Sequence, residues 1–137
     1  MTSPAPLSIF PTHETHGDVY SATCPCRHLL EVVANKWSAL AIGALAHGPV
    51  RFGVLQHELS GISPKVLTST LRRLERYGLV HREVFPAVPL HVEYSLTEIG
   101  RTALEPVFAL REWAESHYDH ASVIAAQIDD ARPLSNG

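Results

Sequence analysis

One stretch, Ser63 to Tyr77, restricts the fold of this chain more than any other. Ser63 is a favourable N-cap residue, and Pro64 suits the first helical position, where its missing N–H is not needed. Gly78 suits the position after a helix, where a left-handed backbone is common. The segment therefore predicts a helix that runs as far as Tyr77.

This helix has two unlike faces. At about 100° per residue, Leu67, Leu71 and Leu74 form a narrow apolar seam, and Glu75 lies between the faces as the only acid. The opposite face carries Lys65, Thr68, Ser69, Arg72, Arg73 and Arg76. A basic, hydroxyl-rich face above a buried seam suits contacts with phosphates and base edges. The alternative is a solvated surface helix.

Charge is distributed unevenly along the chain. The formal net charge is −3, yet residues 51–82 hold six basic and two acidic side chains and carry +4, which leaves −7 elsewhere. The six bases are Arg51, Lys65, Arg72, Arg73, Arg76 and Arg82. Such asymmetry indicates one anion-binding face on an acidic body.

Length and hydropathy exclude several classes of protein. With 137 residues, 45% of them hydrophobic, the chain suits one domain with one core. No apolar run approaches the ~18 residues of a membrane span, and the N-terminus lacks the basic and apolar regions of a signal peptide. We therefore expect a cytoplasmic protein with no membrane partner.

Residues 1–22 are rich in Pro, Thr, Ser and His without periodicity, and they predict a flexible arm before a domain over 23–120. A helix is expected over 25–34, with Cys24 near its N-cap. A helix N-terminus lowers the pKa of a thiol and favours the thiolate, and Arg27 would add to this effect. The alternative is a half-buried cysteine that only packs.

Two cysteines in a Cys-x-Cys spacing do not easily bridge each other, so no disulfide framework is expected. Together with His13, His16 and His28, Cys24 and Cys26 lack the spacing of a structural zinc site, and no distant ligand pair completes one. We predict no metal and no cofactor. The remaining histidines suit surface or packing positions: His47, His57, His81, His91, His117 and His120.

A helix-turn-helix pattern leads into the basic helix. A helix is expected over 36–46, with Leu40 on its buried face. A short strand over 50–52 then precedes a helix over 53–59, in which Val54 should face inward. Because about three residues join this short helix to the basic helix, the pair predicts a helix-turn-helix.

Beyond Gly78 the hydrophobic period changes from 3.6 to 2. Residues 79–85 and 90–96 predict two antiparallel strands, and Pro86 and Pro89 mark the hairpin tip because proline cannot donate to a ladder. A hairpin directly after a helix-turn-helix is a wing, which lies over the DNA backbone or enters the minor groove. The alternative is an ordinary hairpin.

The C-terminal part predicts further helices. Thr97 should cap a helix over 98–104, and Pro106 either kinks it or opens a new one. The apolar residues that follow recur at helical spacing, and they would cover either the domain's own core or a partner. Residues 121–137 are expected to extend the helix to about Ile128 and then fray.

These stretches resemble the HxlR-type branch of the MarR-like winged-helix transcriptional regulators, over about residues 24–118. The order and spacing of the shared motifs make the resemblance specific. The matching stretches are Cys24-Pro25, Asn35-Lys36-Trp37, 48–52 (GPVRF), 61–68 (GISPKVLT), 71–75 (LRRLE), 78–80 (GLV), 88–89 (VP) and 92–100 (VEYSLTEIG).

The resemblance implies a mainly α fold with a small β-hairpin wing: a winged helix-turn-helix domain with N- and C-terminal dimerisation helices. It implies a homodimer with a recognition helix in the major groove of each half-site, and a gene-control role that is usually repression. In several members a cysteine at the position of Cys24 senses oxidants or electrophiles.

The chain departs from the family pattern in places. Asn35 stands where the family usually has glycine, and Leu90 stands where a second proline often follows. Cys26 and His28 lie outside the pattern, so no particular sensing chemistry follows from the resemblance.

The leading hypothesis is a homodimeric repressor that binds a pseudo-palindromic operator in double-stranded DNA and responds to an oxidant or electrophile through Cys24. The alternative is a regulator released by a small-molecule inducer at the dimer interface, with Cys24 structural. The basic window argues against a module that only binds proteins or ligands. An enzyme is disfavoured because neither a catalytic pairing nor a phosphate loop is present.

Three sets of residues carry these hypotheses. The DNA-binding set is Arg51, Ser63, Pro64, Lys65, Thr68, Ser69, Arg72, Arg73, Arg76 and His91. The redox-sensing pair is Cys24 and Cys26. The dimer-interface set is Leu29, Val33, Val107, Phe108, Leu110, Trp113 and Tyr118.

Overall fold

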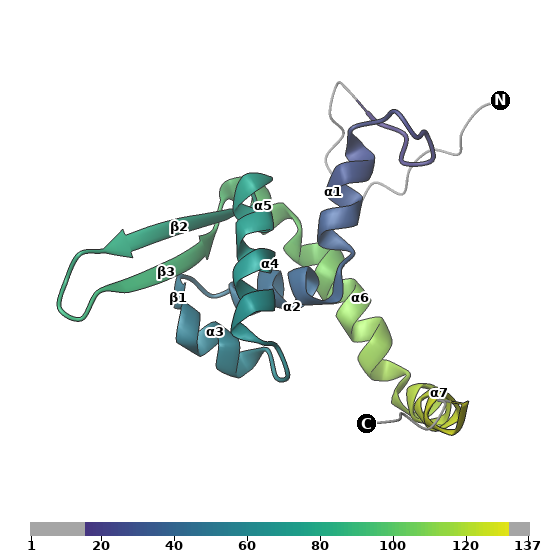
Figure 1. Cartoon of the computed structure of the whole chain (residues 1–137). Helices are drawn as coiled ribbons and strands as arrows, with labels where there is room; N and C mark the ends of the chain where they lie inside the picture. Colours follow the sequence, from purple (N-terminus) through teal and green to yellow (C-terminus); the bar gives the residue numbers. More distant parts are fainter. Residues whose placement is uncertain (1–15, 132–137) are drawn as a thin grey trace.

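The computed structural model describes residues 16–131, which form a helical body and one three-stranded sheet. The elements in order are α1 (Cys26–Val33), α2 (Lys36–Ala44), β1 (Val50–Arg51), α3 (Phe52–Glu58), α4 (Pro64–Arg76), β2 (Val80–Phe85), β3 (His91–Leu96), α5 (Glu98–Thr102), α6 (Leu104–Ser116) and α7 (Tyr118–Ala131). Figure 1 shows the β2–β3 hairpin projecting from one side of the helical body, with α1 and the α6–α7 segment extending from the other. None of these helices combines the length and apolarity needed to cross a membrane.

The basic helix is α4, and it forms as predicted. The Ser63 hydroxyl accepts a hydrogen bond from the Val66 amide at 3.1 Å, which satisfies one donor that the first helical turn leaves free. Gly78 follows the helix with φ of +77°, a left-handed conformation that costs glycine little. The boundaries predicted from the capping residues are confirmed.

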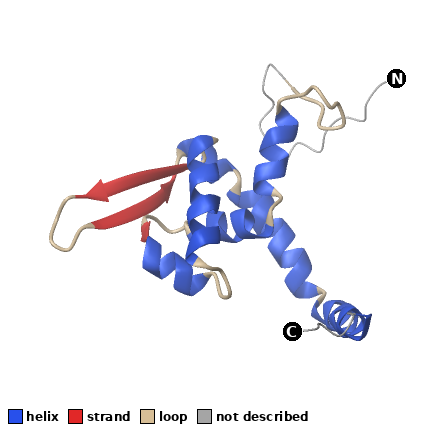
Figure 2. Cartoon of the chain, in the orientation of Figure 1, coloured by secondary structure: helices blue, strands red, loops and turns tan. Residues whose placement is uncertain are grey.

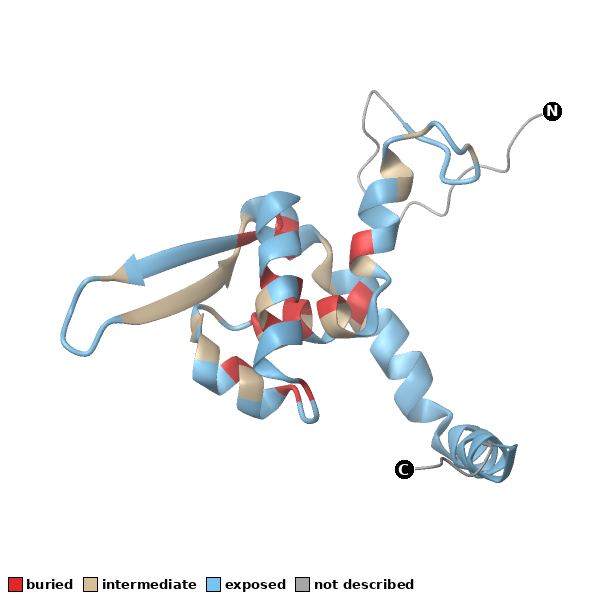
Figure 3. Cartoon of the chain, in the orientation of Figure 1, coloured by how far each residue is buried: buried red, intermediate tan, exposed pale blue. Residues whose placement is uncertain are grey.

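The core lies where α4 packs against α2, at the centre of Figure 3. Leu67, Leu71 and Leu74 are almost completely buried there, as their spacing predicts. Each buried leucine removes apolar surface from water and contributes about 1.5–3 kcal/mol. The buried residues of α2 are Ser38, Ala41 and Ile42, and its C-cap residue Leu45 is buried as well.

Two residues expected to face inward do not. Leu40 is 41% exposed and Val54 is 48% exposed. The buried stripe of α2 starts at Ser38 and repeats at i+3, i+4 and i+7, so it is rotated away from Leu40. In the two-turn helix α3, Leu55 and the following Leu59 fill the core contact, which turns Val54 to solvent.

Asn35 has a structural role at the start of α2. Its side-chain oxygen accepts hydrogen bonds from the Trp37 amide at 2.9 Å and the Ser38 amide at 3.3 Å. Asparagine is among the preferred N-cap residues, so it serves at this position at least as well as the glycine usual in the family.

The sheet has the order β1-β3-β2, and both pairings are antiparallel (Figure 2). Val80 pairs with Leu96 at the base of the hairpin, and Phe85 pairs with His91 near its tip. β1 pairs with the other edge of β3, through Val50 opposite Tyr94. As the central strand, β3 is half-buried along its whole length and does not show the alternating burial that its sequence predicts.

The chain turns sharply between β3 and α6. The Thr97 hydroxyl caps α5 by accepting from the Gly100 amide at 3.0 Å, and it donates to the Gly78 carbonyl at 2.6 Å. α5 ends at Thr102, so the single helix expected over 98–104 is shorter than predicted. Pro106 lies in the first turn of α6 and therefore belongs to a new helix.

α7 is a separate helix that includes residues 129–131, which were expected to fray. None of its residues is buried, and Figure 3 shows α7 and the outer half of α6 exposed along their length. The rest of the expected frayed tail, 132–137, and the first part of the expected arm, 1–15, lie outside the described residues.

Gly100 provides a test of how the wing is attached to the domain. A Cβ on Gly100 would overlap the Leu79 carbonyl oxygen, whereas a Cβ on Gly53, on the exposed side of α3, would meet nothing within 4 Å. We expect Gly100→Ala to lower the free energy of unfolding by about 1–3 kcal/mol or more, because the backbone must move.

Gly53→Ala is the matched control and should raise the unfolding free energy by about 0.5–1 kcal/mol, since alanine restricts the unfolded chain. Urea denaturation at one fixed protein concentration measures both variants. Equal stabilities for the two variants would contradict the close contact between α5 and Leu79.

Candidate nucleic-acid interface

The outward face of α4 gathers most of the predicted DNA-binding residues. Thr68 is half-buried at the edge of this face. The exposed members, which we call the α4 basic face, are Lys65, Ser69, Arg72, Arg73 and Arg76. They lie along one shallow depression of the surface, opposite the buried leucine seam. The structure therefore brings these side chains together on one surface, as the helical period predicts.

Within residues 16–131 the cations of the α4 basic face have no carboxylate partner. Among residues 16–131, the ion pairs within 4.0 Å join His28 to Glu31, Arg111 to Glu115, and a histidine to a glutamate on the wing. Lys65 and the three arginines of α4 are in none of them. Their positive charge is therefore available to an external anion, at the end of the molecule that carries the wing.

A hollow of about 490 Å³ separates α4 from the wing. Arg72 of α4 and Arg82 of β2 both line it, together with Phe52, Thr68, Glu75, Val92 and Tyr94. Arg82 was not among the predicted DNA-binding residues. Arg82 belongs to the basic segment 51–82, and this was the one indication in the sequence that it could bind DNA. Its position beside α4 depends on the pairing of Arg82 with Tyr94 across the hairpin, which the sequence does not show.

Four predicted residues occupy other positions. Ser63 and Pro64 form the start of α4, where the serine side chain is already used as the cap. Arg51 is exposed on β1, at the base of the wing. His91 lies near the hairpin tip, stacked on Phe85 with ring centroids 4.8 Å apart. Its Nε2 also lies 3.1 Å from a Glu93 carboxylate oxygen, so this ring is engaged within the wing and away from α4.

The two cysteines meet at the start of α1. Their Sγ atoms lie 2.7 Å apart, and both thiols are free. The hydrogen bond from the Cys26 thiol is the main cause that lowers the pKa of Cys24, and the backbone amides of Cys26 and Asp18 add to it. The same hydrogen bond raises the pKa of Cys26, which keeps its proton. The pair therefore combines a thiolate-prone sulfur with a proton-donating one.

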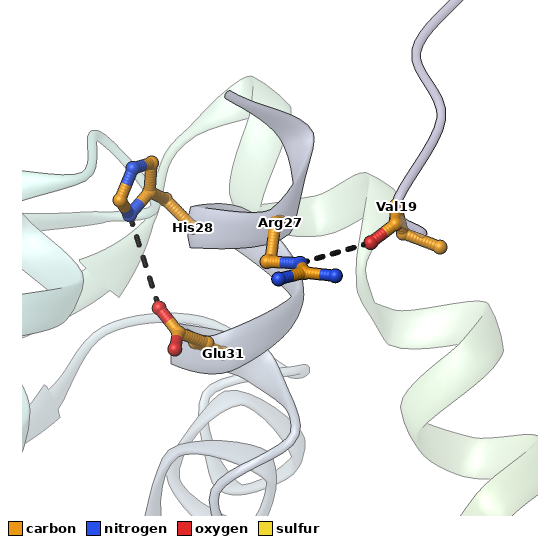
Figure 4. Close-up of polar contacts among 4 residues, drawn as sticks. All are labelled: Val19, Arg27, His28 and Glu31. Atoms are coloured by element: carbon orange, nitrogen blue, oxygen red, sulfur yellow. Dashed lines mark hydrogen bonds and ion pairs between the residues drawn. The ribbon is translucent and has the colours of Figure 1, made fainter. Parts of the chain in front are cut away.

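This geometry corrects the expected cause of thiol activation. The main influence on Cys24 is its neighbour Cys26, and Arg27 does not contribute. Figure 4 shows Arg27 reaching back to the preceding segment, where its Nε donates to the Val19 carbonyl at 3.0 Å. His28 points the other way, toward Glu31 at 3.8 Å. Within residues 16–131 no three His, Cys, Asp or Glu side chains gather as a metal site.

The predicted dimer residues are divided between the surface and the core. Val107 packs inside the subunit's own core, and Val33 and Phe108 are half-buried. The exposed members are Leu29, Leu110, Trp113 and Tyr118. Three further exposed apolar residues lie on α7 and were not among the predicted dimer residues: Val123, Ile124 and Ile128.

A short helix, a tight turn and a helix with an exposed basic outer face, followed by a hairpin, define a winged-helix DNA-binding protein. Comparison with known proteins gives the family. The model described as "HxlR-like helix-turn-helix" matches residues 32–122. The chain belongs to the HxlR-like helix-turn-helix family.

Individual proteins agree with this assignment. The chain is 40% identical over 99 residues to the uncharacterized HTH-type transcriptional regulator YtfH of Escherichia coli (strain K12), covering 72% of this chain and 79% of the relative. It is similar to a solved structure of ytfH from Salmonella typhimurium, with a TM-score of 0.70, 37% identity, and coverage of 82% of this chain and 98% of that one.

A second solved structure is that of the redox regulator HypR in its oxidized form. It aligns with a TM-score of 0.64 and 41% identity, over 69% of this chain and 97% of that chain. These comparisons assign the chain to helix-turn-helix transcriptional regulators and not to enzymes.

Proposed function

We propose that two copies of this chain form a repressor that binds a pseudo-palindromic operator and releases it when Cys24 and Cys26 react. The single observation that carries the DNA-binding part is the α4 basic face. It is exposed above a fully buried leucine seam, and its cations are in no ion pair with a carboxylate of residues 16–131. An α-helix fits the major groove of B-DNA, so this face suits a recognition helix.

The residues of α4 divide by position. Lys65, Thr68 and Ser69 lie in the N-terminal half, and in helix-turn-helix proteins that half approaches base edges. Arg72, Arg73 and Arg76 lie toward the other end, where they would mostly contact phosphates. We propose that the sugar-phosphate backbone of one DNA strand lies in the hollow between α4 and the wing.

Dimerisation is proposed through the exposed apolar side chains of α1, α6 and α7. Trp113 is 62% exposed and Tyr118 is 73% exposed, although both are large and apolar. Large apolar side chains left exposed on several helices are typical of an interaction site. Two-fold symmetry would then place two α4 helices about one turn of DNA apart, which is the geometry of a palindromic operator.

The response to oxidants is proposed for the cysteine pair. Cys24 has a lowered pKa and is only partly buried, the two properties that make a thiol reactive toward oxidants. The similarity to HypR, which is described as a redox regulator, supports the proposal. Oxidation would join Cys24 to Cys26 or to a partner's cysteine, shift α1 and weaken DNA binding. We place the regulator in the cytoplasm.

One observation favours a second candidate, a regulator released by a small ligand. A mostly apolar hollow of about 360 Å³ lies between α2 and α6. Lys36, Arg111 and Glu115 line it together with Leu40, Val107 and Leu110. Because Arg111 is paired with Glu115 at 3.7 Å, Lys36 is the cation that would bind the charged end of an amphipathic anion. In this candidate the inducer acts beside the dimer interface and Cys24 is structural.

The first prediction from this proposal concerns the arginines of α4. We expect Arg72→Ala, Arg73→Ala and Arg76→Ala to weaken operator binding. Each phosphate contact that is lost should reduce the slope of log K against log salt by about 0.9. A residue that reads a base should instead cost about 1–3 kcal/mol at one operator position and relax specificity there.

Fluorescence anisotropy on operator variants, found by footprinting the intergenic DNA beside the gene, measures both effects. Lys36→Ala, which removes an exposed cation from α2, is the charge-matched control. It should retain the wild-type slope of log K against log salt. Equal loss on every operator variant would exclude base reading by that arginine. Binding that does not depend on salt would contradict the DNA role altogether.

The second prediction concerns the dimer. Trp113→Glu should convert the dimer to monomers, because a carboxylate would be buried without a partner in the interface. The control is Val88→Glu, the same kind of change at the fully exposed hairpin tip. Sedimentation velocity should show a monomer for the first variant and a dimer for the second. A wild-type chain that sediments as a monomer would contradict the proposed assembly.

The third prediction concerns the switch. Mild diamide or peroxide should reduce operator affinity of the wild-type protein, and Cys24→Ser should be insensitive. A non-reducing gel and peptide mapping then show whether the new bond lies within or between subunits. If no adduct or crosslink forms and DNA binding persists, the cysteines are structural and the ligand-released candidate is favoured.

A further inference from the structure

The Cys24 and Cys26 thiols are arranged as one bidentate group. The chain passes from a turn into the first residue of α1, and this brings the two sulfurs to 2.7 Å although a proline separates them. Both side chains are half-buried, so a small molecule can reach them. Two sulfurs this close can bind the same atom.

The backbone before Cys24 closes one side of the pair. A Cβ on Gly17 would stand 2.7 Å from the Cys26 sulfur and 2.9 Å from the Cys24 sulfur, so only glycine fits there without displacing them. The next residue, Asp18, donates its amide to the Cys24 sulfur at 3.3 Å. The sulfurs therefore lie against backbone that fixes their positions.

Arg27 holds this segment against α1. Its Nε donates to the Val19 carbonyl at 3.0 Å and its Nη2 donates to the Tyr20 carbonyl at 3.1 Å. Figure 4 shows the first of these bonds, which joins α1 to the segment that bends back over its start. Because these bonds fix the loop before a ligand arrives, little conformational entropy is lost on binding.

We propose that Cys24 and Cys26 of one subunit form a dithiol site for a trivalent arsenical. Thiolate pairs select soft centres. A structural zinc site needs four ligands, and no third His, Cys, Asp or Glu joins the pair within the described residues. A pyramidal arsenic(III) centre accepts two sulfurs on the same side, as found here, whereas a linear two-coordinate ion needs them on opposite sides.

The reaction requires no oxidant. The first thiol adds across the As=O bond and gives one As–S bond and one As–OH group, which takes the first thiol proton. The second thiol then displaces this hydroxyl: the As–O bond breaks, the second As–S bond forms, and the hydroxyl leaves as water with the second thiol proton. An arsine oxide therefore takes up both thiols and releases one water molecule, and arsenic remains trivalent. The hydrogen bond that favours thiolate character at Cys24 provides the first nucleophile, and Cys26 closes the ring.

The site lies near the end of α4. Cys26 and Leu29 line a hollow that also contains Tyr77, the residue directly after α4. An arsenical substituent projecting into this hollow would contact the C-terminal end of the recognition helix. The proposed effect on DNA, a release when arsenic binds, rests on the proposed function. The binding itself does not.

The probe is phenylarsine oxide, added to the full-length reduced protein. Intact-mass spectrometry should show one phenylarsenic group per chain, which persists in excess monothiol and is removed by 2,3-dimercaptopropanol. Cys24→Ser and Cys26→Ser should each weaken binding by about 10²–10⁴-fold, because the second bond forms at a high effective concentration. Gly17→Ala should keep both thiols and weaken binding by roughly tenfold, about 1.4 kcal/mol.

Two results would overturn the site: an adduct equally resistant to monothiol on either serine variant, or an adduct that joins two chains. The serine variants remain informative because circular dichroism reports whether each one folds. Operator binding by the untreated protein is measured in parallel. Loss of that binding alone would count against the regulator, whereas loss of the adduct alone would count against the dithiol site.

Discussion

Burial of the leucine seam determines the direction in which α4 faces, and the proposed DNA contact depends on it. Leu67, Leu71 and Leu74 are removed from water against α2, each contributing about 1.5–3 kcal/mol. A rotated α4 would expose these side chains and bury guanidinium groups without partners, which is far more costly. Hydrophobic packing, and not attraction to DNA, therefore holds the α4 basic face outward before any ligand is present.

The position of the wing follows from the same helix. The Leu79 amide donates to the Leu74 carbonyl at 2.9 Å, and the Thr97 amide donates to the Leu79 carbonyl at 3.1 Å. The two strands of the hairpin are thus fixed to the C-terminal end of α4. A rigid base of this kind keeps Arg82 beside Arg72, so α4 and the wing form one concave surface. The opposite side of the molecule retains the exposed apolar faces of α6 and α7.

Local signals in the sequence predicted the parts that depend on local physics. The cap at Ser63, the turn at Gly78 and the leucine period gave α4 its limits and its buried face. The prediction of burial failed where contacts with a distant segment of the chain determine it. Leu40 is exposed because it borders the hollow that remains between α2 and α6, and the even burial of β3 reflects its two neighbouring strands. The contact between Cys26 and Cys24 arises from a turn whose geometry no periodicity encodes.

The central claim is that the outward side of α4 lies against operator DNA. A photo-crosslinking amino acid placed at Ser69, on that side, tests it most directly, with Val123 on the exposed face of α7 as the comparison position. The account predicts that irradiation of the complex joins operator DNA to the chain through position 69 and leaves position 123 free of DNA. Crosslinks through position 123, with none through position 69, would contradict it.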